Sequence, residues 1–319
     1  LLSRRQRQMC IRDRYNGLKY IRVGTQTLLE SGTIIRQQKL LHADFDRTKA
    51  IIIAIEEYYP GPRNRMPNVR YAKADAFSFK NMLQNTMDVK DEDILMFVNE
   101  EAFQNVLENE ISSFVKMLKE KDRLIFYYAG HGFHDGLTNY LSTYDTYPTN
   151  IFETSVSLDQ VLLTPLKRSE CKNALLFIDA CAQKLNSDIE RSVISDLQDD
   201  EFKVLTTSFP YYGVFLSCQV GETSYASDLL GHGIWTYHLV GALSGKHREI
   251  LRDGKYLTDT MLLHFLSDTV PDYTWKELGK RQNPKTILDS TRENIITNFD
   301  KETFERKDTN STIDIKELE

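Results

Sequence analysis

The sequence of 319 residues lacks the features that mark several classes of protein. It has only four cysteines, Cys10, Cys171, Cys181 and Cys218, which lack metal-ligand spacing and are too sparse for a disulfide framework. No apolar run approaches the roughly 20 residues of a membrane-spanning helix, so no membrane span is expected. A net charge of −6 is mild for this length and argues against a general nucleic-acid binder.

The composition that remains is that of a soluble globular protein. Hydrophobic residues make up 41% of the chain and charged residues 27%, which allows a sizeable core. The start is basic without an apolar core segment, so it is not expected to act as a secretory signal. The few cysteines favour a reducing, cytoplasmic setting, in which a reactive thiol stays free.

Three outer segments differ in composition from the main domain. Residues 1–14 are basic and are interpreted as a non-native leader or a disordered arm. Residues 15–47 are interpreted as an N-terminal stub, with a strand over 18–24 and a helix-like piece over 31–41. Residues 301–319 are expected to form a polar tail.

The stub has two interpretations. Its run from Tyr20 to Thr27 resembles the tail of Schlafen-like DNA-binding domains, which implies a remnant of a DNA-associated regulator. The alternative is an added strand that packs on the main domain, because so short a piece cannot fold alone. The main domain is expected over residues 48–300, and nucleic acid is not expected to bind it.

Two long apolar runs in the main domain each end in a reactive side chain. One spans residues 123–132 and contains His131, and the other spans residues 173–181 and ends at Cys181. Such runs are typical of buried parallel strands. Ligands bind at the carboxyl ends of strands in open α/β sheets, so neighbouring strands would bring the thiol and the imidazole face to face.

The remaining periodicity predicts an α/β domain. Four more apolar runs complete a sheet of six mostly parallel strands, over 50–55, 94–98, 214–218 and 285–288. Helices are predicted over 69–86, 103–119, 158–166, 233–245 and 258–270, the last with Thr258 as its N-cap. Residues 182–203 are predicted to be a polar loop.

The two reactive runs resemble a known family. Tyr-Ala-Gly-His-Gly at 128–132 and Ile-Asp-Ala-Cys at 178–181 are similar to the dyad motifs of caspase-like cysteine peptidases, nearest the metacaspase and bacterial branch. The histidine precedes the cysteine by about 50 residues, as in that family. Gly-His-Gly-Ile-Trp-Thr-Tyr at 231–237 and Arg-Gln-Asn-Pro at 281–284 extend the likeness over about residues 49–298. The animal-caspase signature Gln-Ala-Cys-x-Gly is absent.

This resemblance implies a three-layer α/β/α sandwich that carries a Cys–His endopeptidase. Cys181 would attack the scissile carbonyl, and His131 would protonate the leaving amine and later activate water. The backbone N–H groups of Gly132 and Cys181 would bind the oxyanion. The other thiols are expected to be structural, and no cofactor is required.

The resemblance also implies a specificity pocket lined by two acids. Asp179 is expected on the same strand face as Cys181, and Asp75 belongs to an Asp-Ala pair on the first helix. Two carboxylates would favour a protein or peptide substrate with Arg or Lys before the scissile bond. The alternatives are that Asp75 caps or solvates its helix and that Asp179 is a structural hydrogen-bonder. Ala129 stands where the family often has Ser.

Regulation and activity leave further alternatives. Self-cleavage of the 182–203 loop at Lys184 or Arg191 is our hypothesis for activation. Asp188 and the acids of 196–200 could bind calcium, with a solvated acidic loop as the alternative. A catalytically inactive caspase-like scaffold that signals by binding, in a bacterial stress or defence system, is the alternative to the peptidase.

Overall fold

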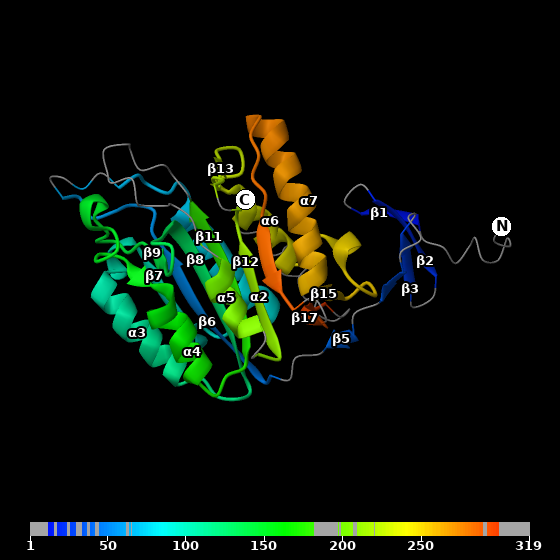
Figure 1. Ribbon diagram of the computed structural model, residues 1–319, viewed down its shortest axis with the longest axis horizontal. Helices are drawn as coiled ribbons and strands as arrows, with labels where there is room; N and C mark the ends of the chain where they lie inside the picture. The colour runs from blue at the N-terminus through cyan, green and yellow to red at the C-terminus, as the bar shows by residue number, and fades with distance from the viewer. Residues whose placement is uncertain are drawn as a thin grey trace, which may run out of the picture. The chain divides into compact units, whose positions relative to one another are not determined.

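The computed structural model describes thirteen stretches of the chain (Figure 1). They are residues 12–15, 18–23, 26–29, 34–36, 39–41, 45–61, 64, 66–181, 197, 199–206, 209–219, 221–289 and 292–299. The chain divides into two compact units, residues 1–41 with 290–293, and residues 42–289 with 294–319.

The first unit contains a small antiparallel sheet. Its four strands follow one another in chain order as β1 (Arg12–Tyr15), β2 (Leu18–Val23), β3 (Gln26–Leu29) and β4 (Ile34–Arg36). The next strand along the chain, β5 (Lys39–Leu41), is not part of this sheet. The strand expected over 18–24 is confirmed as β2. The helix-like piece expected over 31–41 is wrong, because β4 and β5 lie within it. The β-branched pair Ile34 and Ile35 favours extended backbone.

A mostly parallel sheet forms the centre of the second unit. Its strands are β6 (Arg47–Ala54), β7 (Ile94–Val98), β8 (Asp122–His134), β11 (Asn173–Cys181), β12 (Tyr211–Leu216) and β16 (Lys285–Leu288), in the spatial order β7-β6-β8-β11-β12-β16. Only β16 among them runs antiparallel to its neighbour. The six strands predicted from the apolar runs are therefore confirmed. β9 (Asn139–Leu141) pairs antiparallel with the last residues of β8, Gly132–His134, and β10 (Val156–Ser157) pairs antiparallel with β9.

Helices cover both faces of this sheet (Figure 1). On one face α2 (Ala72–Met87) packs against α6 (Ile234–Leu243), and α6 packs against α7 (Asp259–Leu278). On the other face α3 (Gln104–Lys116) packs against α4 (Thr164–Arg168) and the π-helical turn Asp159–Leu163 before it, beside α5 (Asp199–Thr206). Apolar strands are buried between these layers, as Ile51, Ile52 and Ile53 of β6 show at 0% exposure.

Shorter elements complete the unit. Two antiparallel pairs are β13 (Ala226–Ser227) with β14 (His232–Gly233), and β15 (Tyr256–Thr258) with β17 (Arg292–Asn298). Single 3₁₀ turns occupy Asp91–Asp93, Asn99–Glu101, Pro148–Asn150 and Arg248–Ile250. None of the helices in the described ranges is long and apolar enough to cross a membrane.

Two element ends differ from expectation. The Thr258 side chain accepts a hydrogen bond from Met261 N at 3.1 Å, which confirms the predicted N-cap of α7. The helix does not end before Pro271 but continues to Leu278, because its buried face continues through Val270 to Thr274. The loop expected over 182–203 is wrong in its last part, where α5 begins at Asp199. The rest of that loop, apart from Leu197, lies outside the described residues.

Candidate active site

The register between β8 and β11 brings the two reactive residues to the same point. The strands are parallel neighbours, and Cys181 is the register partner of His131. Two residues earlier, Asp179 pairs with Ala129. The backbone of Cys181 is thereby placed beside the histidine at the carboxyl edge of the sheet, while its side chain lies outside the described part of the structure.

The loop that follows β6 holds the imidazole of His131. His131 is 1% exposed, and its Nε2 lies 2.8 Å from the carbonyl oxygen of Pro67. A carbonyl can only accept, so Nε2 carries the hydrogen in the neutral ring and a proton would be gained or lost at Nδ1. The ring also stacks on Tyr58, with centroids 5.4 Å apart and an interplanar angle of 20°. Both contacts were missed from the sequence.

A set of buried hydroxyls fixes the backbone of His131. Its N–H donates to Ser142 Oγ at 3.1 Å, and its carbonyl accepts from Tyr128 Oη at 2.8 Å. Ser142 Oγ lies 2.7 Å from both Tyr128 Oη and Tyr58 Oη. The phenol of Tyr128 packs against Gly130, and a Cβ added to residue 130 would lie 2.7 Å from Tyr128 Cζ. A glycine is therefore required before the histidine for a packing reason.

Gly132 also lies in a closely packed place. A Cβ at this position would be 2.9 Å from the Cβ of Ala180, the residue before Cys181. The residue pairs with Leu141 of β9. Its lack of a side chain is thus explained by the contact between β8 and β11, independently of any role of its N–H in binding an oxyanion.

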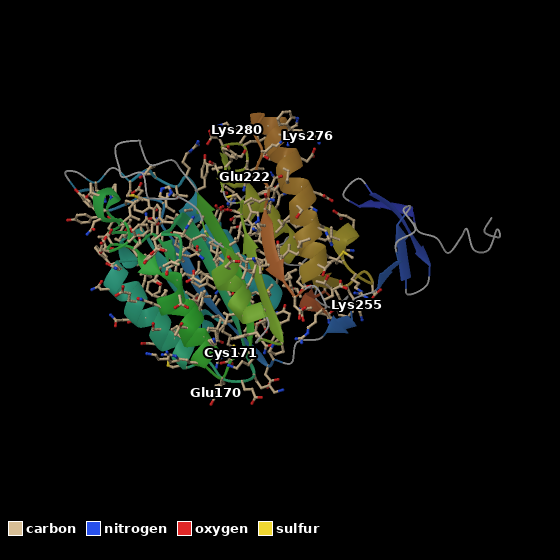
Figure 2. The ribbon with its side chains drawn as sticks, in the orientation of Figure 1. Glu170, Cys171, Glu222, Lys255, Lys276 and Lys280 are labelled. Atoms are coloured by element: carbon tan, nitrogen blue, oxygen red, sulfur yellow. The ribbon has the colours of Figure 1, made fainter. Side chains whose placement is uncertain are left out.

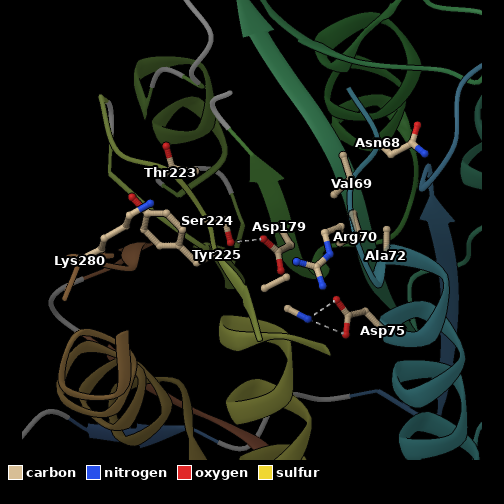
Figure 3. A pocket seen from close by; sticks show the side chains of 13 residues that line it. Asn68, Val69, Arg70, Ala72, Asp75, Asp179, Thr223, Ser224, Tyr225 and Lys280 are labelled. Carbon is tan, nitrogen blue, oxygen red and sulfur yellow. Dashed lines mark hydrogen bonds between the residues drawn. The ribbon is translucent and has the colours of Figure 1, made fainter. Parts of the chain in front are cut away.

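A pocket of about 500 Å³ lies beside this edge (Figure 3). It is lined by Asn68, Val69, Arg70, Ala72, Asp75, Ala129, Asp179, Thr223, Ser224, Tyr225, Ala226, Gly233 and Lys280. Asp75 from α2 and Asp179 from β11 thus line one cavity. Figure 2 shows Lys280 and Glu222 at this end of the unit and the buried Cys171 at the opposite end, where its Sγ contacts Asp122 O at 3.1 Å.

Asp179 is held by hydroxyl groups. Its Oδ1 accepts from Ser224 Oγ at 2.7 Å and its Oδ2 from Thr236 Oγ1 at 2.9 Å. Gln282 Nε2 donates in turn to Ser224 Oγ at 3.0 Å. Asp179 is 5% exposed, and its burial raises the pKa of the carboxyl above its ordinary value. The structural hydrogen-bonding that the sequence left as an alternative is therefore present within the pocket wall.

Asp75 is tied to the segment around β14. Its Oδ2 accepts from Gly233 N–H at 3.0 Å, and its Oδ1 lies 2.7 Å from His232 Nδ1. The helix-cap alternative for Asp75 is wrong, because its carboxylate bonds to another element and the N-cap of α2 is Tyr71. Burial raises the pKa of Asp75 to about 7; the His232 hydrogen bond opposes this rise and the Asp179 carboxylate adds to it.

Gly233 shows that the two carboxylates face a common point. A Cβ at this position would lie 2.8 Å from Asp75 Oδ2 and 3.1 Å from Asp179 Oδ2. Any side chain larger than hydrogen would collide with the acids. The contact of His232 with Asp75 was missed, although Gly-His-Gly had been noted as a motif at the start of a helix.

The pocket rim carries an ion pair that the sequence did not indicate. Arg70 lines the pocket and forms a salt bridge with Asp228, and Tyr71 Oη donates to the same carboxylate at 2.6 Å. The side chains of Arg70 and Asp228 are 60% and 71% exposed. Lys280, on the other wall, lies over the ring of Tyr225.

The other sequence-based site residues lie mostly outside the described ranges. Lys184, Arg191, Asp188 and Asp196 are all in that group, while Asp199 and Asp200 begin α5. Within the described ranges, no group of three or more His, Cys, Asp or Glu side chains is arranged to hold a metal ion.

Comparison with known proteins agrees with this architecture. The caspase domain family model matches residues 47–296. The crystal structure of caspase-1 from Spodoptera frugiperda is similar in fold, with a TM-score of 0.53 at 13% identity over 84% of this chain and 96% of that one. A search of curated proteins gave no match. On the family match and the fold together, the chain belongs to the caspase-domain family of cysteine peptidases.

Proposed function

We propose that the protein is a cysteine endopeptidase that uses a Cys181–His131 dyad to cleave protein or peptide substrates after Arg or Lys. The observation that carries this proposal is the β8–β11 register, which pairs the two residues next to a pocket containing two buried carboxylates. The proposal needs no metal or cofactor.

The proposed chemistry follows from the position of His131. Because Nε2–H is directed at the Pro67 carbonyl, Nδ1 is the atom that would accept the Cys181 thiol proton. The thiolate would add to the scissile carbonyl, and the Gly132 and Cys181 N–H groups would stabilise the oxyanion. Imidazolium would then protonate the leaving amine, and the neutral ring would activate the water that releases the acyl group.

The proposed preference for a basic residue rests on the two buried acids of the pocket. Arg70 and Lys280 also line it, but Arg70 is paired with Asp228 and Lys280 lies over the ring of Tyr225. Asp75 and Asp179 are 2% and 5% exposed and face the same point, so a cationic side chain entering the pocket would meet both in a water-poor environment. Ser224 and Thr236 orient Asp179 by donating to it, which leaves its other lone pairs for a guanidinium or ammonium group. A substrate Asp would be repelled.

Fluorogenic peptides with Arg, Lys or Asp before the reporter test this function. We expect cleavage of the Arg and Lys peptides, none of the Asp peptide, and none by the Cys181→Ala variant. Equal release by wild type and Cys181→Ala would instead support the inactive scaffold. Intact-mass analysis of the incubated protein tests self-cleavage at Lys184 or Arg191, since nicks at other residue types would contradict it.

Two matched variants test the pocket separately. Asp179→Asn should reduce kcat/KM for the Arg peptide by about 100-fold or more, because a buried charge partner is removed. Asp228→Asn, an acid at the exposed rim, should change it by less than about fivefold. Equal effects of the two variants would argue against the buried acids as the specificity determinants.

A further inference from the structure

The aromatic ring of Tyr58 is stacked on the imidazole of His131. The two rings lie nearly parallel, at 20° and 5.4 Å between centroids. Tyr58 is 8% exposed, so the stacked pair is largely shielded from water. Tyr58 and Pro67 both belong to the loop between β6 and α2, and they contact the imidazole on its face and at its edge.

The hydroxyl of Tyr58 fixes the ring in this position. Tyr58 Oη lies 2.7 Å from Ser142 Oγ and accepts a hydrogen bond from His131 N–H at 3.3 Å. One arrangement satisfies every hydroxyl: Tyr58 donates to Ser142, Ser142 donates to Tyr128, and Tyr128 donates to the His131 carbonyl. Because Ser142 and Tyr128 are 0% exposed, this chain of hydroxyls holds the ring against the imidazole.

The Tyr58 ring interacts more strongly with the protonated form of His131 than with the neutral form. A neutral imidazole gains only ordinary aromatic stacking, whereas an imidazolium is also attracted by the negative face of the ring within about 6 Å. This attraction is strengthened where water is excluded. The contact therefore favours the protonated ring.

We infer that Tyr58 is a positioning residue of the dyad, whose ring stabilises the His131 imidazolium and thereby favours the thiolate of Cys181. The inference rests on the proposed Cys–His function, because an imidazolium is useful here only as the partner of a thiolate. The titratable groups of the described residues that contact His131 are the phenols of Tyr58 and Tyr128. The β8–β11 register adds Cys181, and the neighbouring pocket adds Asp75 and Asp179.

A titration of His131 in the full chain tests the inference without relying on activity. In a Cys181→Ala background the thiol is absent, and phenols ionise only near pH 10. The imidazole signals of the seven histidines can be followed by NMR after ¹⁵N-histidine labelling, with His131→Gln identifying the relevant one. Asp75 and Asp179 are common to all variants, so their influence cancels in the comparison.

Three substitutions separate the ring from its surroundings. Tyr58→Leu should lower the pH at which His131 titrates by about one unit, whereas Tyr58→Phe keeps the ring, loses only the hydroxyl that holds it, and should lower this pH by less than about 0.5. Tyr59→Leu, the same change at the adjacent and exposed position, should have no effect. If Tyr58→Leu titrates like the parent, or if Tyr58→Phe falls as far as Tyr58→Leu, the inference is overturned.

Kinetics on the active enzyme give a second readout. Tyr58 does not line the pocket, so Tyr58→Leu should lower kcat for the Arg peptide by about tenfold with little change in KM. A change confined to KM would contradict the inference. If even the wild type cleaves no peptide, the proposed function fails, whereas the titration still decides the role of Tyr58.

Discussion

At the level of one residue, Asp75 shows how a buried carboxylate at a pocket lowers the stability of the folded protein. Its carboxylate is buried at the pocket wall, close to the second acid Asp179, and burial raises its pKa to about 7. An unfolded aspartate ionises near pH 4. Between these two values the folded protein holds a proton that the unfolded chain has released, so its stability falls as the pH rises.

Replacing Asp75 with Asn should remove this pH dependence. Between about pH 5 and about pH 8, the stability of Asp75→Asn relative to wild type should rise by about 2–3 kcal/mol, as measured by urea unfolding at both pH values. Asp228→Asn changes an acid whose side chain is 71% exposed and serves as the control, with no such rise. A constant difference between Asp75→Asn and wild type across this range would contradict the assigned burial effect.

The sequence could predict residues of the site only where they stand next to a recognisable strand or motif. His131 and Cys181 follow long apolar runs, Asp179 shares a strand with the cysteine, and Asp75 belongs to an Asp-Ala pair. Tyr58 and Ser142 approach from loops whose sequences carry no comparable pattern. His232 lies within the Gly-His-Gly motif, but that motif does not reveal its contact with Asp75. Their contacts depend on three-dimensional packing between segments far apart in the chain, which a one-dimensional period cannot encode.

At the level of the elements, β8 is fixed at both of its ends by polar groups. Near its carboxyl end lies the hydroxyl network of His131, and at its start lies Arg123, which is 3% exposed. The Arg123 guanidinium donates to the carbonyl of Ile296 in β17 at 2.7 Å and to Thr48 Oγ1 in β6 at 3.2 Å. It also lies 4.1 Å from the ring centroid of Phe45. One side chain therefore joins three segments at the base of the sheet.

Removing this guanidinium should destabilise the fold. Arg123→Met leaves a buried carbonyl and hydroxyl without their donor, and we expect the free energy of unfolding to fall by about 2–4 kcal/mol. Arg123→Lys should restore little, because an ammonium lacks the planar fork that reaches both acceptors. Arg168→Met, at an exposed position of α4, should change stability by less than about 0.5 kcal/mol in the same urea titration. Equal effects at positions 123 and 168 would contradict the role of the buried contacts.

Helices and strands with a long, uninterrupted apolar pattern could be predicted from the sequence. Elements whose extent depends on tertiary packing could not. The apolar strands and the Thr258 cap agree with the structure because their signal is local. α7 continues past Pro271 because its buried face extends to Thr274, so tertiary packing overrides the local preference to end a helix at proline. β4 and β5 replace an expected helix in a stretch where the apolar period was too short to distinguish the two.

At the level of the whole molecule, the division into two units predicts which part of the chain can fold by itself. The continuous core of buried side chains runs from Ala50 to Phe299 and includes residues of both faces of the central sheet. All of these residues belong to the second unit, residues 42–289 with 294–319. The pocket and the dyad strands belong to it as well. This unit thus contains everything that a cooperative domain needs: its own sheet, two helical layers and a core.

We therefore expect a fragment that begins at His42 and keeps the rest of the chain to fold by itself. Because the fragment keeps every core side chain among the residues whose burial the structure describes, its free energy of unfolding should lie within about 0.5 kcal/mol of that of the full chain, with the same denaturant slope. Urea unfolding followed by circular dichroism and by tryptophan fluorescence provides the measurement, since both tryptophans, Trp235 and Trp275, are in the fragment. A lower slope or non-coincident transitions would mean that residues 1–41 take part in the cooperative unit, and the division at residue 42 would then be wrong.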